Sequence, residues 1–401
     1  MNALPDIPFA PPTHTIGGWF PDRSQTLLLR AALLDKEHAA PAFESWIRRP
    51  SKTGIDAASW RLLPLLAWNL KRLGLDHPLL ETIESIHRYV WLRNMVHLNR
   101  ARQAVELIEG LGVATLLLKG APLVQRYYED PGLRSMEDFD VLIPSDKAWD
   151  TIQFFIENKW QESFIQSKLD REWVAHHHSL NFVGPDDTRL DLHWHVFPER
   201  VLPGNDDAFW SNAEPVEING AATLALSPTD ELLAACLHAI RWEKVPPIRW
   251  IADAHTILQT GASIEWRRMI EQADQLGQLL PLRAALSMLR FQFDAPIPDE
   301  TLRALNVHQP DNRERYELLR KIYSPDAANL QETLSLHFHR YKVCLEEWPE
   351  FKGPAGFCRY LQREWKLDDW KKAPFVAASK TCRRGLRTIR DMLVSRSRRT
   401  P

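Results

Sequence analysis

Glycine is scarce in this chain, with 16 among 401 residues, or about 4% where about 7% is usual. This shortage disfavours a β-barrel or sandwich built on glycine turns and favours helices. Cysteine is also rare, and no two cysteines form a C-x-x-C pair. The four are Cys236, Cys344, Cys358 and Cys382. A disulfide framework is therefore not expected, and a reducing cytosol fits better.

Long hydrophobic runs are missing as well. The apolar run at 113–118 is far shorter than the ~20 residues that span a bilayer. The N-terminal segment has no basic stretch followed by an apolar one, so no signal peptide is predicted. Neither sign of charge dominates, because 50 basic and 52 acidic side chains leave a formal charge of −2. We therefore expect a cytoplasmic protein with no membrane contact, whose main partner is not a long polyanion.

The rest of the composition is that of an ordinary globular chain, with 44% hydrophobic and 25% charged residues. Apolar residues recur at helical spacing in the N-terminal part, and a long helix is predicted from Leu79 to Gly110. Helices are predicted again after a strong start signal at Ser227-Pro228-Thr229-Asp230. The expected domains are a helical region at 1–112, an α+β module at 113–225 and a helical region with a basic tail at 226–401.

The middle block is the one part rich in predicted strands. The strands are expected at 113–118, 139–143, 176–183 and 189–195, and a helix at 146–158. Between the first two strands, Lys119-Gly120-Ala121-Pro122 predicts a turn into a helix. Further helices are expected at 228–241, 247–260, 264–276, 279–292, 313–323, 327–345 and 354–366. The fold class is therefore α+β, mostly helical overall, with a small mixed sheet.

Three acids in this block suggest a metal site. Asp138 and Asp140 are two residues apart at the start of a predicted strand, so both carboxylates should project from one face. A third acid, Asp191, lies in a strictly alternating strand that places His193 and His195 on its face. Clustered carboxylates repel one another, and a divalent cation with oxygen preference, Mg²⁺ or Mn²⁺, relieves that repulsion. Such a triad suits nucleotidyl transfer.

The Lys-Gly-Ala segment, the Arg-x-x-x-Asp-x-Asp motif from Arg134 and the Asp-Leu-His-Trp segment from Asp191 together resemble the uncharacterised nucleotidyltransferase family of the DNA polymerase β-like superfamily. The helix start at 227–233 and the Arg249-Trp250-Ile251-Ala252-Asp253 segment add to the resemblance, which covers about 80–260. It implies a small sheet of polymerase-β-like type, with Asp138, Asp140 and Asp191 as catalytic metal ligands.

Many members of that superfamily have Gly-Gly or Gly-Ser at the turn before the acids, whereas this chain has Gly120-Ala121 after Lys119. Lys119, Gly120 and Arg134 are therefore the predicted partners of the NTP phosphates. His193 is predicted to orient Asp191.

Plainer interpretations stand beside these. Arg134 can instead pair with Glu137 or Asp138 on a turn. Asp253 can be a buried acid or can face the cleft. The histidines at 176–178 and at 193 and 195 suggest a rival transition-metal site. The arginine-rich C-terminus is either a solvated face or a contact patch for an acidic partner.

The predicted function is metal-dependent transfer of an NMP from an NTP to a hydroxyl-type acceptor, with release of pyrophosphate. The acceptor can be a small molecule, a peptide, a protein or an RNA end. Two alternatives remain: a catalytically degenerate binding or scaffold protein of the same fold, and a His/Asp metal-dependent hydrolase.

Overall fold

A computed structural model shows how these segments fold. It describes residues 18–48, 54–163, 169–199, 201–238, 240–241 and 243–310, and beyond these 314–315, 318, 337–338, 341, 345, 351–365 and 367–379. The chain forms two compact units. The first contains the described residues of 1–164 and 170–323, and the second those of 165–169 and 324–401.

Five helices open the first unit, and aspartates begin three of them. The Asp22 side chain accepts a hydrogen bond from the Gln25 amide, and Asp35 and Asp56 cap the next two helices in the same way. The helices are α1 (Arg23–Leu33), α2 (Lys36–Ile47), α3 (Ala57–Trp60), α4 (Leu63–Arg72) and α5 (Leu79–Glu109). The predicted long helix is thus confirmed as α5.

A seven-stranded mixed sheet follows, in the order β3-β4-β5-β2-β1-β7-β6. The strands are β1 (Leu116–Leu118), β2 (Phe139–Leu142), β3 (Gln161–Glu162), β4 (Ser179–Val183), β5 (Arg189–His193), β6 (Glu214–Ile218) and β7 (Ala221–Ala225). The central strand β2 runs antiparallel to β1 and parallel to β5. Both β1 and β2 are buried along their whole length, as their continuous apolar sequence predicts.

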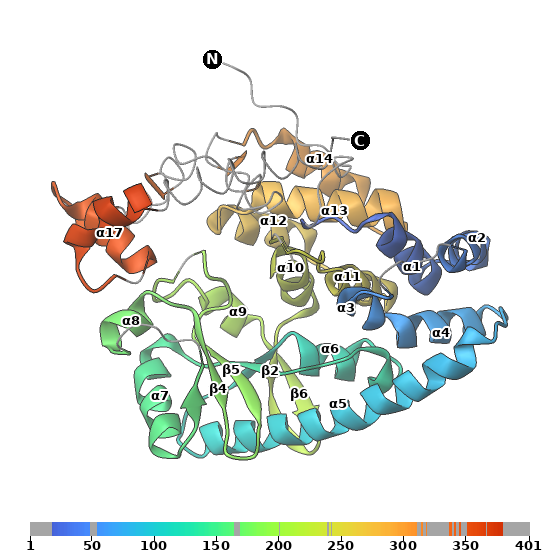
Figure 1. The fold of residues 1–401 in the computed structure, drawn as a ribbon, viewed down its shortest axis with the longest axis horizontal. Coiled ribbons are helices and arrows are strands. Elements are labelled where there is room, and N and C mark those ends of the chain that lie inside the picture. Colours follow the sequence, from blue (N-terminus) through green and yellow to red (C-terminus); the bar gives the residue numbers. More distant parts are fainter. Residues whose placement is uncertain are drawn as a thin grey trace, which may run out of the picture. The chain divides into compact units, whose positions relative to one another are not determined.

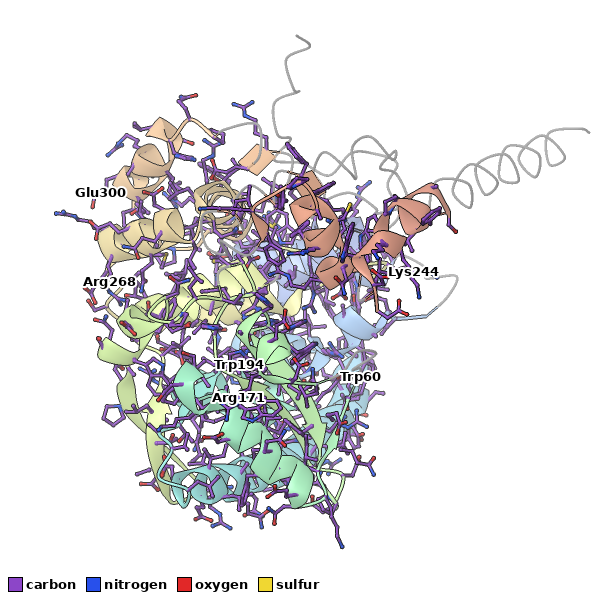
Figure 2. The ribbon with its side chains drawn as sticks, turned by 90° about the vertical axis from the view of Figure 1, so that its left-hand side faces the viewer. Trp60, Arg171, Trp194, Lys244, Arg268 and Glu300 are labelled. Carbon is purple, nitrogen blue, oxygen red and sulfur yellow. The ribbon has the colours of Figure 1, made fainter. Side chains whose placement is uncertain are left out.

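Helices connect and cover the sheet. Its connections contain α6 (Gly120–Arg126), α7 (Ala148–Glu157), α8 (Arg171–Ala175) and α9 (Asp207–Ser211), with short 3₁₀ turns at Pro131–Leu133 and Ser145–Lys147. In Figure 1 the long α5 runs across the strands. Trp194, just after β5, is buried and donates its indole N–H to the carbonyl of Val174 on α8; Figure 2 marks its position in this layer.

The remaining helices of the first unit lie beyond one end of the strands (Figure 1). They are α10 (Pro228–His238), α11 (Arg249–Gln259), α12 (Trp266–Gln275), α13 (Leu279–Phe293) and α14 (Asp299–Val307). One apolar core joins α1, α4, α10, α11 and α13. The second unit contains α17 (Gly356–Glu364) and a 3₁₀ turn at Trp370–Lys372, packed around Tyr341, Phe351 and Tyr360.

The predicted fold class is confirmed: the described chain is mostly helical, with a mixed sheet. The sequence interpretation omitted the hairpin of β6 and β7, although Asn219-Gly220 between them is a strong hairpin signal. Both residues have positive φ, 49° and 91°. It also omitted α14. The predicted helices at 313–323 and 327–345 and the basic tail at 383–399 lie mostly or wholly outside the described residues. Within the described part, no helix is both long and apolar enough to cross a membrane.

Candidate active site

The turn between β1 and α6 is unusually shaped. Lys119 has φ 53° and ψ −113°, a conformation that a side chain disfavours. The next residue has little free space, because a Cβ on Gly120 would lie 3.2 Å from Met136 Sδ and 3.3 Å from Arg134 Nη1. The predicted turn into a helix is confirmed, and it brings Lys119 and Gly120 to the end of the central strands.

Register places two of the predicted acids side by side. In the parallel pairing of β2 and β5, Asp140 lies directly opposite Asp191. Residues opposite each other on neighbouring strands share one face of the sheet. Asp140 is 5% exposed, and the Oδ1 atom of Asp191 is buried with no hydrogen-bond partner among the described residues.

Two cations compensate these carboxylates. The Lys119 Nζ atom donates to Asp140 Oδ1 at 2.6 Å, and His193 Nε2 lies 3.1 Å from the same oxygen and 2.9 Å from Asp191 Oδ2. Burial opposes ionisation at all four groups, but the opposite charges outweigh it. The pKa values of Asp140 and Asp191 are therefore lowered and that of Lys119 is raised, while the pKa of His193 rises to about 9.

Asp138, the remaining predicted acid, lies at the start of β2 rather than within the strand. The strand β2 begins at Phe139, so Asp138 lies one residue before it and is exposed. It lines the same cavity as Asp140 and Asp191. Partial burial and the nearby charge of Asp140 raise the pKa of Asp138. Among the described residues, the group with ligand atoms within 4.8 Å of one another is Asp140, Asp191 and His193.

Arg134 is held by Asp253, a residue 119 positions away in the sequence. Its Nε and Nη2 atoms donate to the two carboxylate oxygens at 2.7 and 2.9 Å, and the Tyr128 hydroxyl donates to Oδ1 at 2.7 Å. All three side chains are buried. The Arg134 charge outweighs burial and lowers the pKa of Asp253. Neither Glu137 nor Asp138 is this partner; the Glu137 carboxylate pairs with Arg61 at 2.5 Å.

The other histidines near the strands have separate surroundings. His195 Nδ1 lies 2.6 Å from Asp206 Oδ2, so it does not join the group around Asp191. His177 stacks on Trp173, with ring centroids 3.8 Å apart. His178 contacts the ring of His193, and burial lowers the pKa of His178 to about 4. His177, His178 and His195 thus contact different groups.

A cavity of about 440 Å³ contains the whole candidate site. It lies between the strand ends and helices α10 and α11, and it is lined by Lys119, Gly120, Arg134, Asp138, Asp140 and Asp191. All predicted acids and phosphate-binding residues therefore meet in one cavity. His193 does not line the cavity, but it contacts Asp140 and Asp191, which do.

Glu231 and His238 of α10 also line this cavity, and sequence reasoning missed both as site residues. The start signal at 227–230 predicts where α10 begins, but it does not indicate that Glu231 faces a site. A usable signal was present: Glu231, Ala234, Ala235 and His238 recur at the spacing of one helix face.

The geometry defines an α+β protein with an acidic cluster on two parallel strands, suited to a divalent cation. Carboxylate oxygens are the ligands that hard cations prefer, and the unpartnered Asp191 Oδ1 leaves a buried acceptor for one. A family model described as "Uncharacterised nucleotidyltransferase" matches residues 57–294, more than half of the chain. The chain belongs to this family, which confirms the resemblance noted from its motifs.

Two solved structures are similar to parts of the chain. One is the lincosamide antibiotic adenylyltransferase LnuA with lincomycin bound, at 14% sequence identity and a TM-score of 0.24. The match covers 34% of this chain and 83% of LnuA. The other is an antigenic nucleotidyltransferase-like protein from Paracoccidioides brasiliensis, at 16% sequence identity and a TM-score of 0.34. The match covers 52% of this chain and 93% of the other protein. No curated protein matches the chain.

Proposed function

We propose that this protein is a metal-dependent nucleotidyltransferase that moves an NMP from an NTP to a hydroxyl-type acceptor. The acceptor oxygen attacks the α-phosphorus, the bond to the β-phosphate oxygen breaks, and pyrophosphate leaves. One observation carries the proposal: Asp140 and Asp191 lie in register on parallel strands at a cavity, in a chain of a nucleotidyltransferase family.

The acids fit a hard divalent cation, Mg²⁺ or Mn²⁺. Asp140 and Asp191 would hold it from the sheet, and Asp138 would contribute from the exposed loop at the start of β2. When bound, the metal neutralises phosphate charge and favours deprotonation of the acceptor hydroxyl. His193 contacts both sheet acids, so its role is to fix their orientation.

The phosphates of the NTP would bind beside the acids, at the Lys119-Gly120 turn and at Arg134. Lys119 supplies a cation there, and Gly120, without a side chain, lets Arg134 lie close to the turn. Arg134 uses Nε and Nη2 to hold Asp253, and its Nη1 atom is directed at the Gly120 turn. Asp253 and Tyr128 thus position Arg134 so that one nitrogen remains for a phosphate oxygen. Charge neutralisation and positioning would supply most of the rate.

The test follows label from an α-³²P-labelled NTP, with Mg²⁺ or Mn²⁺, into a small-molecule extract, purified RNA, peptides and the protein itself, with pyrophosphate measured in parallel. We expect labelled product from the wild type and at least about a hundredfold less from Asp191→Asn. The matched control is Asp187→Asn, because Asp187 is an exposed acid on the turn before β5 and should change little.

Two outcomes would favour the alternatives. NTP binding without label transfer or pyrophosphate, across all acceptor classes, supports a binding or scaffold protein of this fold. Copurification of a transition metal that is lost in His193→Ala supports the hydrolase instead.

A further inference from the structure

The cavity contains several buried polar atoms that the described chain leaves without a hydrogen bond. Besides Asp191 Oδ1, they are both carboxylate oxygens of Glu231, Nε2 of His238 and Nε1 of Trp250. A buried polar group without a partner costs free energy, so such groups are rare in folded proteins. Their concentration around one cavity indicates that a polar ligand completes them.

Glu231 has the greatest need for a ligand among these groups, because both of its carboxylate oxygens lack a hydrogen bond. Its side chain is 2% exposed, and its closest cation is Arg126, whose Nη1 lies 3.5 Å from Oε2. Arg126 is already engaged, because it donates to the Leu226 carbonyl at 2.7 Å and pairs with Glu214. Burial raises the pKa of Glu231 to about 8. The carboxyl group is therefore kept from water beside the Arg126 guanidinium and the Tyr127 hydroxyl, and neither of its oxygens has a well-formed hydrogen bond.

The walls next to Glu231 are apolar. Ala234 and Ala235 lie on the same face of α10 and line the cavity, as do Leu123 of α6 and Leu226 before α10. A space with apolar walls and a polar group at its end suits a flat ligand with apolar faces and a polar edge. A nucleobase has this chemistry.

The distance along α10 also fits a nucleotide. His238 lies at the acidic end of the cavity, where burial and, to a smaller extent, the charges of Lys119 and His193 lower its pKa. Glu231 lies seven residues earlier on the helix, or roughly 10 Å at 1.5 Å per residue, comparable to the length of a nucleoside. A cavity of about 440 Å³ is within the range for one small ligand.

We propose that Glu231 binds the hydrogen-bonding edge of the nucleobase of the NTP, with the base held between α6 and α10. This inference rests on the proposed function and assigns the base-binding part of the same cavity. Glu231 is then a selectivity residue, which contacts the nucleotide away from the reacting phosphate.

The experiment is a calorimetric titration of the full chain with ATP, GTP, CTP, UTP and inorganic tripolyphosphate, each with Mg²⁺. We expect the wild type to bind at least one NTP about tenfold more tightly than tripolyphosphate. Glu231→Leu should remove that advantage and bring the four NTPs together, while tripolyphosphate affinity stays unchanged. Glu231→Gln, which retains a donor and an acceptor, should still prefer NTPs but in a changed order.

The matched control is Glu214→Leu, because Glu214 also pairs with Arg126 but does not line the cavity. It should leave NTP preference intact, and thermal unfolding of each variant checks that it is folded. Unchanged NTP preference in Glu231→Leu, or an equal loss in Glu214→Leu, overturns this inference and leaves the proposed function standing. A wild type that binds neither NTP nor tripolyphosphate overturns the proposed function, and this inference with it.

Discussion

At Lys119 the backbone and the side chain have opposite requirements. Its φ of 53° and ψ of −113° suit glycine, whereas its ammonium group donates to Asp140. A side chain held in such a conformation costs of order 1–3 kcal/mol. This free-energy cost of the Lys119 conformation is consistent with a site that requires a cation beside the acids.

Two substitutions separate the effect of the Lys119 charge from the effect of its backbone conformation. Lys119→Ala and Lys119→Gly both remove the cation, so both should weaken NTP binding to the same extent. Only glycine relieves the backbone, so Lys119→Gly should be more stable than Lys119→Ala by about 1 kcal/mol. Urea unfolding of the two variants measures the difference, and greater stability of the alanine variant would contradict backbone strain at this position.

Glu231 should make stability depend on pH. Burial raises its pKa in the folded protein from the ordinary 4.5 to about 8, so between these values the folded state holds the proton that the unfolded state releases. The contribution of Glu231 is therefore fully present below pH 4.5 and is lost as pH rises through about 8. The free energy of unfolding of the wild type should fall by a few kcal/mol relative to Glu231→Gln over this range. A constant difference between the two proteins from pH 5 to 9 would refute the buried acid.

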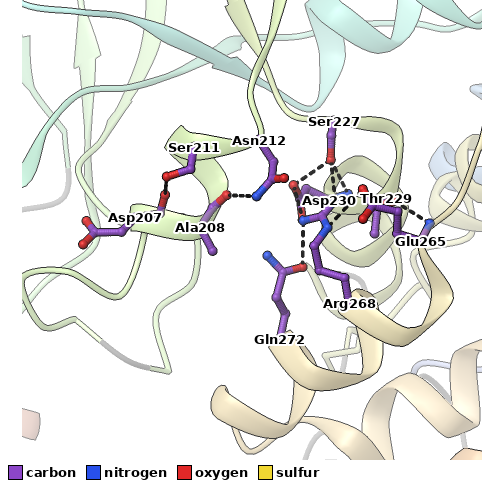
Figure 3. A network of polar contacts seen from close by, with 10 residues as sticks. All are labelled: Asp207, Ala208, Ser211, Asn212, Ser227, Thr229, Asp230, Glu265, Arg268 and Gln272. Carbon is purple, nitrogen blue, oxygen red and sulfur yellow. Dashed lines mark hydrogen bonds and ion pairs between the residues drawn. The ribbon is translucent and has the colours of Figure 1, made fainter.

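At the scale of elements, a buried polar network joins the start of α10 to α12. Arg268 donates to both oxygens of Asp230, at 2.9 and 3.0 Å, and to Ser227 Oγ at 2.9 Å. Thr229 Oγ1 accepts from the Glu265 amide. Figure 3 shows these contacts converging between the two helices. Since α10 forms one wall of the cavity, this network fixes the position of Glu231 and His238.

Removing one partner of this network should cost more than removing both. Asp230 is completely buried, so Asp230→Leu removes the buried carboxylate that pairs with Arg268, leaves it with Ser227 and the exposed Glu265, and should destabilise the protein by about 3–5 kcal/mol. Asp230→Leu combined with Arg268→Met should recover part of that loss. A double-mutant cycle by chemical denaturation measures the coupling, and additive losses would mean that the two side chains act independently.

At the scale of the whole molecule, the sheet, the cavity and its helical wall belong to the first compact unit. The division at 1–112, 113–225 and 226–401 stays a prediction. Residues from all three predicted parts nevertheless line the one cavity, from Arg61 through Asp140 to Asp253. The N- and C-terminal helices of this unit therefore shape the site that the sheet supplies.

A ligand that binds this cavity should stabilise the folded chain. At a concentration of 100 times its dissociation constant, a Mg²⁺–NTP complex should add about 2.7 kcal/mol to the free energy of unfolding. Scanning calorimetry should show a higher unfolding midpoint for the wild type and for Asp187→Asn, but not for Asp191→Asn. An equal rise in Asp191→Asn would indicate that nucleotide binding does not depend on the acidic cluster.

The sequence by itself determined the local features of this protein. Apolar spacing located α5, the helices α10 to α13 and the strands that contain Asp140 and Asp191, because helical and strand periods are set by neighbouring residues. The motif around these acids also identified the family. The Asn219-Gly220 hairpin was equally available in the sequence, although it was missed.

Only the tertiary structure decided which distant residues meet. The register that sets Asp140 beside Asp191 arises from strand pairing, and one residue of slip would have turned either acid to the other face. Packing of α11 brings Asp253 to Arg134, and the fold brings Arg126 of α6 to the buried Glu231 of α10. Such contacts join residues from 51 to 119 positions apart, and a local pattern contains no information about them.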